Sequence, residues 1–112
     1  VFVSIHLNSF PNIKEASGVE TYYRKDTTYN SEELATSIQE TIVSYVPTRD
    51  RGVKTAELAV LSNLKMPSVL VEAGFLSNDD ERKKLLDESY QSELAQGIAQ
   101  GILTFLDEYL SE

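Results

Sequence analysis

The sequence predicts an α/β fold, with a mostly parallel or mixed sheet flanked by helices. Segments with strand character alternate with segments of helical periodicity, and the strands at 2–7 and 68–72 are nearly continuous apolar runs. Such runs are typical of strands in a sheet that is covered on both faces, as we expect here. The 112 residues, 41% of them hydrophobic and 25% charged, are enough for one ordinary globular domain over residues 1–112. Because the sequence opens inside a strand pattern at Val1, we expect a partial domain whose amino-terminal portion is absent.

Four strands are expected along the chain. The two apolar runs supply the first and the last, and a segment rich in β-branched and aromatic residues supplies the second. A short apolar stretch after a polar, charged connection (48–54) supplies the third. The predicted strands are 1–7, 19–24, 57–61 and 68–72.

The first helix is predicted between two recognisable ends. Asn30 has the character of an N-cap, with Glu33 placed to complete a capping box. Apolar residues then recur every four positions until Pro47 ends the pattern. They are Leu34, Ile38, Ile42 and Val46. This periodicity predicts a helix with one face packed on the sheet.

Two further helices are expected after the last strand. Ser77 or Asn78 is predicted to cap a short helix over 79–87, and a long helix follows over 91–110. Gly97 and Gly101 lie one turn apart on the long helix, where each glycine costs about 1 kcal/mol relative to alanine. Close packing of this helix against a neighbouring element would compensate that loss.

Composition narrows the classes of function. A net charge of −8 argues against nucleic-acid binding, which needs a basic face. No apolar run approaches the roughly 20 residues of a membrane span, and no signal-peptide pattern is present, so we expect no membrane insertion. The absence of cysteine leaves histidine and carboxylates as the ligands for any metal ion.

Glu72 and His6 are the candidate functional pair. Each follows an apolar strand, and open α/β sheets place their chemistry outside the carboxyl ends of strands. Burial raises a carboxyl pKa toward the range of a general base, and imidazole is a preferred zinc donor. A Glu72 paired with a lysine or arginine, and a structural His6, are the competing interpretations. Asn8 could hydrogen-bond a substrate beside His6.

Glu20 is the next candidate ligand, although its position fits surface alternation equally well. A zinc hydrolase needs about three protein ligands and an open position for water. The residues by themselves therefore indicate part of a metal hydrolase site.

Several segments together resemble the zinc-dependent N-acetylmuramoyl-L-alanine amidases of the amidase 3 family. The most specific is the last, which ends the apolar strand at Glu72 and continues through Gly74-Phe75-Leu76-Ser77-Asn78. The resemblance covers nearly the whole chain. The matching segments are 4–8, 18–23, 51–54, 58–61 and 66–78.

The resemblance implies cleavage of the amide between N-acetylmuramic acid and L-alanine of peptidoglycan, outside the cell or in the cell wall. His6 matches a zinc ligand of the family and Glu72 matches its catalytic glutamate. Arg51 could contact a substrate carboxylate, or it could be a solvated loop charge. The family's first histidine ligand and its glutamate ligand precede the segment that matches 4–8. We therefore expect weak or absent Zn²⁺ binding and little activity from this chain alone.

Two other hypotheses about function stay open. A related zinc peptidase could be built on a similar sheet, and a non-catalytic binding module could retain the amidase fold. Missing neighbouring elements would expose apolar surface or a sheet edge, so self-association of the chain is also expected.

Overall fold

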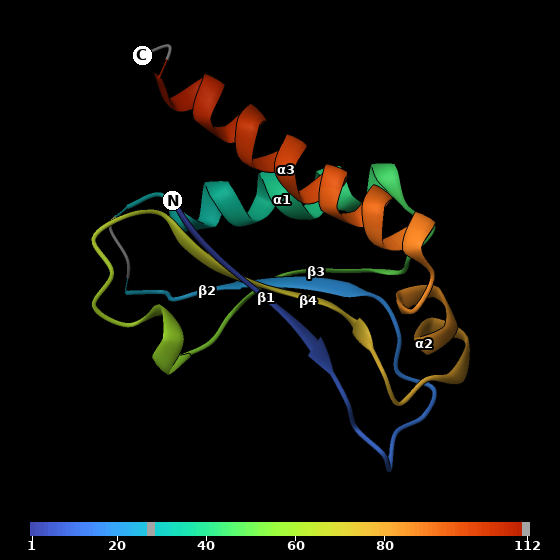
Figure 1. Cartoon of the computed structure of the whole chain (residues 1–112). Helices are drawn as coiled ribbons and strands as arrows, with labels where there is room; N and C mark the ends of the chain where they lie inside the picture. The colour runs from blue at the N-terminus through green and yellow to red at the C-terminus, as the bar shows by residue number, and fades with distance from the viewer. Residues whose placement is uncertain (27–28, 111–112) are drawn as a thin grey trace.

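The structure, a computed structural model, describes residues 1–26 and 29–110 of the chain. It confirms the α/β class: a four-stranded mixed sheet is flanked by three helices (Figure 1). In chain order the elements are β1 (Phe2–Asn8), β2 (Val19–Tyr23), α1 (Ser31–Tyr45), β3 (Asp50–Thr55), the 3₁₀ turn η1 (Ala59–Leu61), β4 (Ser68–Phe75), α2 (Asp79–Leu85) and α3 (Glu88–Leu110).

The sheet has the strand order β1-β4-β2-β3. β1 runs parallel to β4, and β2 runs parallel to β3, but β2 and β4 are antiparallel. The two edges of the sheet are therefore β1 and β3. Because β2 runs against β4, the beginning of β2 lies beside the later part of β4.

Among the described residues, the helices cover one face of the sheet, so the expectation that both faces are covered is wrong. α1 packs on β2, β3 and β4, and α3 packs on α1 (Figure 1). Val69, Val71 and Ala73 of β4 belong to the core that these helices close. Since successive side chains of a strand point to opposite faces, Leu70 and Glu72 point to the other face.

The contact between α1 and α3 depends on the two glycines of α3. A Cβ atom at Gly101 would lie 2.7 Å from the Cα atom of Ile38, and one at Gly97 would lie 3.2 Å from the Cβ atom of Tyr45. A side chain at Gly101 would force the helices apart. The predicted close packing of the long helix is confirmed.

The third predicted strand is wrong. Residues 57–61 form a loop that ends in η1, and the strand lies earlier, at Asp50–Thr55, which overlaps the segment predicted as a connection (48–54). β3 is an edge strand that pairs only with β2, so it does not need an apolar sequence. Of η1, only Leu61 is buried.

The helix ends match the predictions in part. Asn30 is the N-cap of α1, but its backbone is left-handed (φ 61°) and its side chain makes no capping hydrogen bond, so the capping box with Glu33 is wrong. At α2 the prediction holds, because the Asn78 side chain accepts a hydrogen bond from the Glu81 N–H at 3.0 Å. α3 begins at Glu88 instead of residue 91.

Within residues 1–26 and 29–110, no helix combines the length and the apolar character that a membrane crossing requires.

Candidate active site

Glu72 stands on the face of the sheet opposite α1, between two strands that each bring a polar side chain beside it. His6 of β1 is its register partner on one side, and Glu20 of β2 is its partner on the other. Glu72 lies inside β4, three residues before the strand ends at Phe75, and not at its end as the sequence suggested. The structure brings the predicted pair together and adds Glu20 to it.

The Glu72 carboxylate is partly buried and lacks a neutralising partner among the described residues. Its Oε2 atom is buried, and no hydrogen-bond partner for it exists among the described residues. Burial raises the pKa of Glu72 above its ordinary value, His6 lowers it in part, and the nearby Glu20 raises it further. No ion pair to Glu72 is present in the described part of the chain. The competing interpretation, a Glu72 neutralised by a lysine or arginine, is therefore wrong.

Glu20 has the opposite character, although it lies next to Glu72. Its side chain is buried and accepts hydrogen bonds from Arg51 Nε at 3.2 Å, from Tyr22 Oη at 2.8 Å, and from Lys54 Nζ. Burial alone would raise the pKa of Glu20, but these partners lower it below its ordinary value. Surface alternation was the wrong interpretation of this residue. Its carboxylate is already occupied by two cations.

The Tyr22 hydroxyl is linked to the same carboxylate. Burial and the hydrogen bond to Glu20 raise the pKa of Tyr22 to about 12, so the phenol keeps its proton at neutral pH and remains a donor.

A hollow of about 400 Å³ opens beside Glu72 on this face. Two of the predicted substrate contacts, Asn8 and Arg51, line it together with Glu72. The Arg51 guanidinium carbon lies 4.9 Å from the centre of the Phe75 ring, and the Phe10 ring packs against the same ring with centroids 5.8 Å apart. The other lining residues are Glu20, Tyr22, Lys54, Ala56 and Leu58. His6 is exposed and does not line the hollow.

The described residues do not by themselves fit a zinc ion. In the part of the chain that the structure describes, no three His, Cys, Asp or Glu side chains are grouped closely enough to hold a metal. A zinc site needs at least three protein ligands. His6 is suited to one ligand position, whereas Glu20 is engaged by Arg51 and Lys54.

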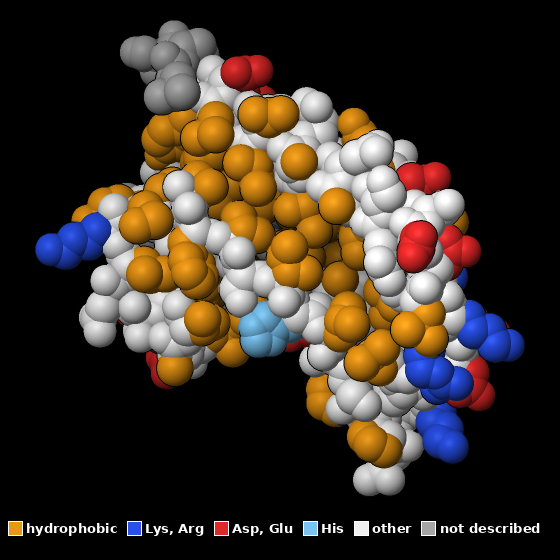
Figure 2. Space-filling model, in the orientation of Figure 1, with side chains coloured by type: hydrophobic (Ala, Val, Ile, Leu, Met, Phe, Trp, Pro, Cys, Tyr) orange, Lys and Arg blue, Asp and Glu red, His pale blue; other side chains and the backbone are white. Residues whose placement is uncertain are grey.

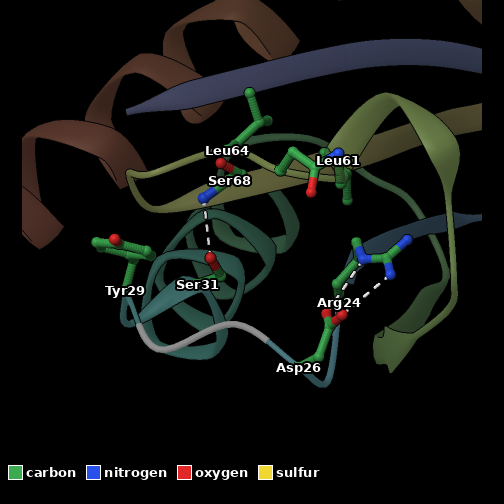
Figure 3. Close-up of a pocket in the computed structure, with 8 residues that line it drawn as sticks. Arg24, Asp26, Tyr29, Ser31, Leu61, Leu64 and Ser68 are labelled. Carbon is green, nitrogen blue, oxygen red and sulfur yellow. Dashed lines mark hydrogen bonds and ion pairs between the residues drawn. The ribbon is translucent and has the colours of Figure 1, made fainter.

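A second hollow, of about 190 Å³, lies near the beginning of β4, away from Glu72 (Figure 3). Among the described residues that line it, the one carboxylate is that of Asp26, which is paired with Arg24 at 3.0 Å. Ser68 N–H donates to Ser31 Oγ at 2.9 Å on the same wall. Because the Asp26 carboxylate is already paired with a cation, the chemistry favours the hollow at Glu72, whose Oε2 has no partner among the described residues.

Sequence reasoning missed the roles of Tyr22 and Lys54. The signal for Tyr22 was the alternation in β2, which places Glu20 and Tyr22 on one face. The role of Lys54 depends on the strand that was mistaken for a connection, so its face could not be assigned.

Comparison with known proteins gives one consistent result. Residues 1–104 match the amidase 3 family, which is described as N-acetylmuramoyl-L-alanine amidase. Two proteins of Bacillus subtilis are similar: the uncharacterized protein YqiI, 45% identical over 96% of this chain, and the N-acetylmuramoyl-L-alanine amidase LytC, 44% identical over 94%. The crystal structure of an N-acetylmuramoyl-L-alanine amidase from Clostridium difficile 630 is 50% identical over 94% of this chain, with a TM-score of 0.90.

The chain spans only part of each of these proteins: 52% of YqiI, 21% of LytC and 56% of the solved chain. The fold, the order of its elements and the match over residues 1–104 agree with one another. The chain belongs to the amidase 3 family of N-acetylmuramoyl-L-alanine amidases.

Proposed function

We propose that the full protein carrying this chain hydrolyses peptidoglycan, cutting the amide between N-acetylmuramic acid and L-alanine of the stem peptide. Membership of the amidase 3 family supports the reaction class. The observation that carries the proposal within this chain is Glu72, whose buried Oε2 has no partner among the described residues and whose register neighbour is His6. Because the substrate is the cell wall, the site of action is extracellular or within the wall.

Glu72 acts as the general base in this proposal. A carboxylate with a raised pKa and an unoccupied oxygen is suited to take a proton from the attacking water. The same oxygen then returns the proton to the leaving amine of L-alanine. The acid limb of the pH–rate profile should lie above 4.5, the ordinary value for a glutamate, because the base must be ionised before it can act.

We propose His6 as one zinc ligand of the complete domain. The remaining donors have to come from outside the described residues, because no three-donor group exists among them. Zinc in such a site supplies a Lewis acid that polarises water and a carbonyl. Without the other donors, the 112-residue chain should hold zinc weakly or not at all.

Asn8 and Arg51 are proposed to contact the substrate, because both line the hollow beside Glu72. The Asn8 amide offers a donor and an acceptor to a peptide group. The Arg51 Nε–H already donates to Glu20. A stem-peptide carboxylate would therefore accept hydrogen bonds from the outer nitrogens of the guanidinium.

The first experiment compares the wild-type protein with Glu72→Gln on purified cell walls, with release of L-alanine amino groups as the readout. Loss of the base should lower the rate by about 10²- to 10⁴-fold. Glu40→Gln is the matched control, since Glu40 is an exposed carboxylate on α1. Full activity in Glu72→Gln would remove the proposed base.

The same assay separates the competing functions. Peptide products without free L-alanine amines would identify a zinc peptidase, and tight wall binding without cleavage would identify a binding module. Zinc content adds a second readout: Glu72→Gln should retain zinc, whereas His6→Ala should lose both zinc and activity.

Self-association is proposed for the isolated chain. β1 is an edge strand, and its Ile5 and Leu7 side chains are 57% and 47% exposed. They border an almost wholly apolar hollow of about 290 Å³ between β1 and α3. Figure 2 shows hydrophobic side chains gathered on this face, with charged side chains mainly at its margins. Sedimentation should reveal concentration-dependent oligomers that Ile5→Lys abolishes; a monomer at high concentration would contradict the proposal.

A further inference from the structure

Glu81 is a buried carboxylate that the proposed chemistry does not use. It lies in the first turn of α2, and only 3% of the residue is exposed. Both of its oxygens accept from backbone amides. Gly18 N lies 3.0 Å from Oε1 and from Oε2, and Phe75 N lies 2.6 Å from Oε1.

These two amides lie at the ends of the strands that form the candidate site. Gly18 immediately precedes β2, two residues before Glu20, and Phe75 is the last residue of β4, three residues after Glu72. The carboxylate of Glu81 therefore joins the beginning of one strand to the end of its antiparallel neighbour. Glu20 and Glu72 face each other across the same pair of strands.

The backbone around Glu81 leaves room for this carboxylate and for little else. A Cβ atom at Gly74 would lie 2.9 Å from Glu81 Oε1. Gly18 has a φ of +111°, and a Cβ there would lie 2.5 Å from the carbonyl oxygen of Arg49. Gly74 thus permits the close approach of the carboxylate, whereas at Gly18 the positive φ and the neighbouring Arg49 favour glycine.

In the described part of the chain, backbone N–H groups, and not a cationic side chain, contact the carboxylate of Glu81. Among the described residues it forms no ion pair, and backbone N–H groups provide its hydrogen bonds. A buried carboxylate is costly compared with an apolar side chain of similar size, even when it is hydrogen-bonded. Its structural effect is to orient the backbone, because its two oxygens hold the amides of residues 18 and 75, which lie 57 positions apart in the sequence.

We propose that Glu81 is a positioning residue for the Glu72 site, which rests on the proposed amidase function. By holding Gly18 and Phe75 to one carboxylate, it fixes the register that sets Glu72 between His6 and Glu20. The end of β4 is also tied to β1, since Leu76 N–H donates to the Asn8 carbonyl at 2.7 Å. Release of Glu81 would loosen the three strand segments that carry the candidate site.

The test is Glu81→Gln in the full protein. Glutamine keeps the shape, but it places an NH₂ group against the N–H of Gly18, which removes an acceptor and adds a second donor. We expect kcat to fall by about 10- to 100-fold while KM and zinc content stay near the wild-type values. Amide hydrogen exchange at Gly18 and Phe75 should become faster.

Ile98→Ala is the matched control, because Ile98 is a buried residue of α3 that packs in the helix-covered core. It should lower thermal stability at least as much as Glu81→Gln, and leave kcat unchanged at temperatures where both variants are folded. If Glu81→Gln and Ile98→Ala have equal kcat there, or if exchange at Gly18 and Phe75 does not change, Glu81 is only a structural residue and the proposal is overturned.

Failure of the proposed function would look different. A wild-type protein that holds the fold but releases no L-alanine amines contradicts the amidase assignment. The exchange measurement at Gly18 and Phe75 still decides, in that case, whether Glu81 fixes the two strands. An inactive Glu81→Gln that retains slow exchange at both amides would contradict the positioning role itself.

Discussion

The two faces of the sheet differ in the side chains that they carry and in how far these are satisfied. Under α1, side chains such as Val69 and Val71 are fully buried among aliphatic residues, and even Thr21 is satisfied, because its hydroxyl donates to the Gln39 side chain at 2.9 Å. On the opposite face, carboxylates occupy the centre of the sheet. One of them, Glu72, is left with a buried oxygen that has no partner among the described residues.

This difference separates the side chains that stabilise the fold from those of the proposed active site. Apolar burial and close helix packing stabilise the fold. A buried, unpartnered carboxylate opposes folding and is kept where chemistry needs it. Substitutions on the helix-covered face should therefore change stability and spare the proposed chemistry, whereas substitution of the unpartnered Glu72 should do the reverse.

The largest effect on stability is expected from Ile38→Ala on the helix-covered face. Ile38 is fully buried in α1 and lies under Gly101 of α3. Truncation should lower the free energy of unfolding by about 2–5 kcal/mol, measured by chemical denaturation. In the folded full protein kcat should not change. A large fall in kcat at full folding would show that the two faces are not independent.

Gly101→Ala tests the helix contact itself. A Cβ atom 2.7 Å from the Ile38 Cα atom cannot be accommodated without separating the helices, so a loss of about 1–3 kcal/mol is expected. The same substitution at Gly97 meets its nearest neighbour at 3.2 Å and gains helix propensity, so it should cost less. Equal melting temperatures for the two variants would contradict this packing argument.

Much of this arrangement was readable from the sequence, because the apolar patterns decide it. The run that became β4 and the four-residue spacing in α1 placed the core correctly, whereas the apolar run of β1 leaves Ile5 and Leu7 exposed. The pairing of His6 with Glu72 followed from two apolar strands that end in polar residues. The glycines of α3 indicated a close neighbour, although the pattern could not say that the neighbour is α1.

Most of the failures involve residues whose environment is set by tertiary contacts. β3 was predicted as a connection because its residues are polar. In the structure, Arg51 and Lys54 of this strand form ion pairs with the buried Glu20. Asn30 was assigned a side-chain cap, but it adopts a left-handed backbone, which asparagine tolerates better than most residues. Glu81 resembled an ordinary helix-surface residue, because its partners are backbone amides far away in the sequence.

Glu20→Gln probes the charged cluster of the open face. Glu20 loses its charge in this variant while Arg51 and Lys54 remain, so a loss of about 1–3 kcal/mol is expected at neutral pH. The pKa of Glu20 is lowered in the fold, so this stability is present above 4.5 and is lost as the pH falls through the folded pKa. Denaturation at several pH values should show the two proteins converge in acid. A constant difference would contradict the assigned charge state.

The smallest effect on stability, and the one opposite in sign, is expected from Glu72→Gln. The pKa of Glu72 is raised in the fold, so the ionised form is less favourable there than in the unfolded chain. The wild-type protein should therefore lose stability as the pH rises above 4.5 through the raised pKa, whereas the variant should not.

Thermal denaturation of both proteins should give a slightly higher melting temperature for Glu72→Gln at pH 7, and equal values once the pH is below the ordinary glutamate range. Glu40→Gln, on the exposed side of α1, should show no such pH-dependent gain. Glu72→Gln less stable than wild type at pH 7 would mean that the carboxylate has a stabilising partner, and Glu72 would then belong with Glu20 among the residues that hold the sheet together. A gain in stability coupled to a loss of activity is the signature of a group kept in the fold for its chemistry, because no structural requirement would select a buried charge that weakens the protein.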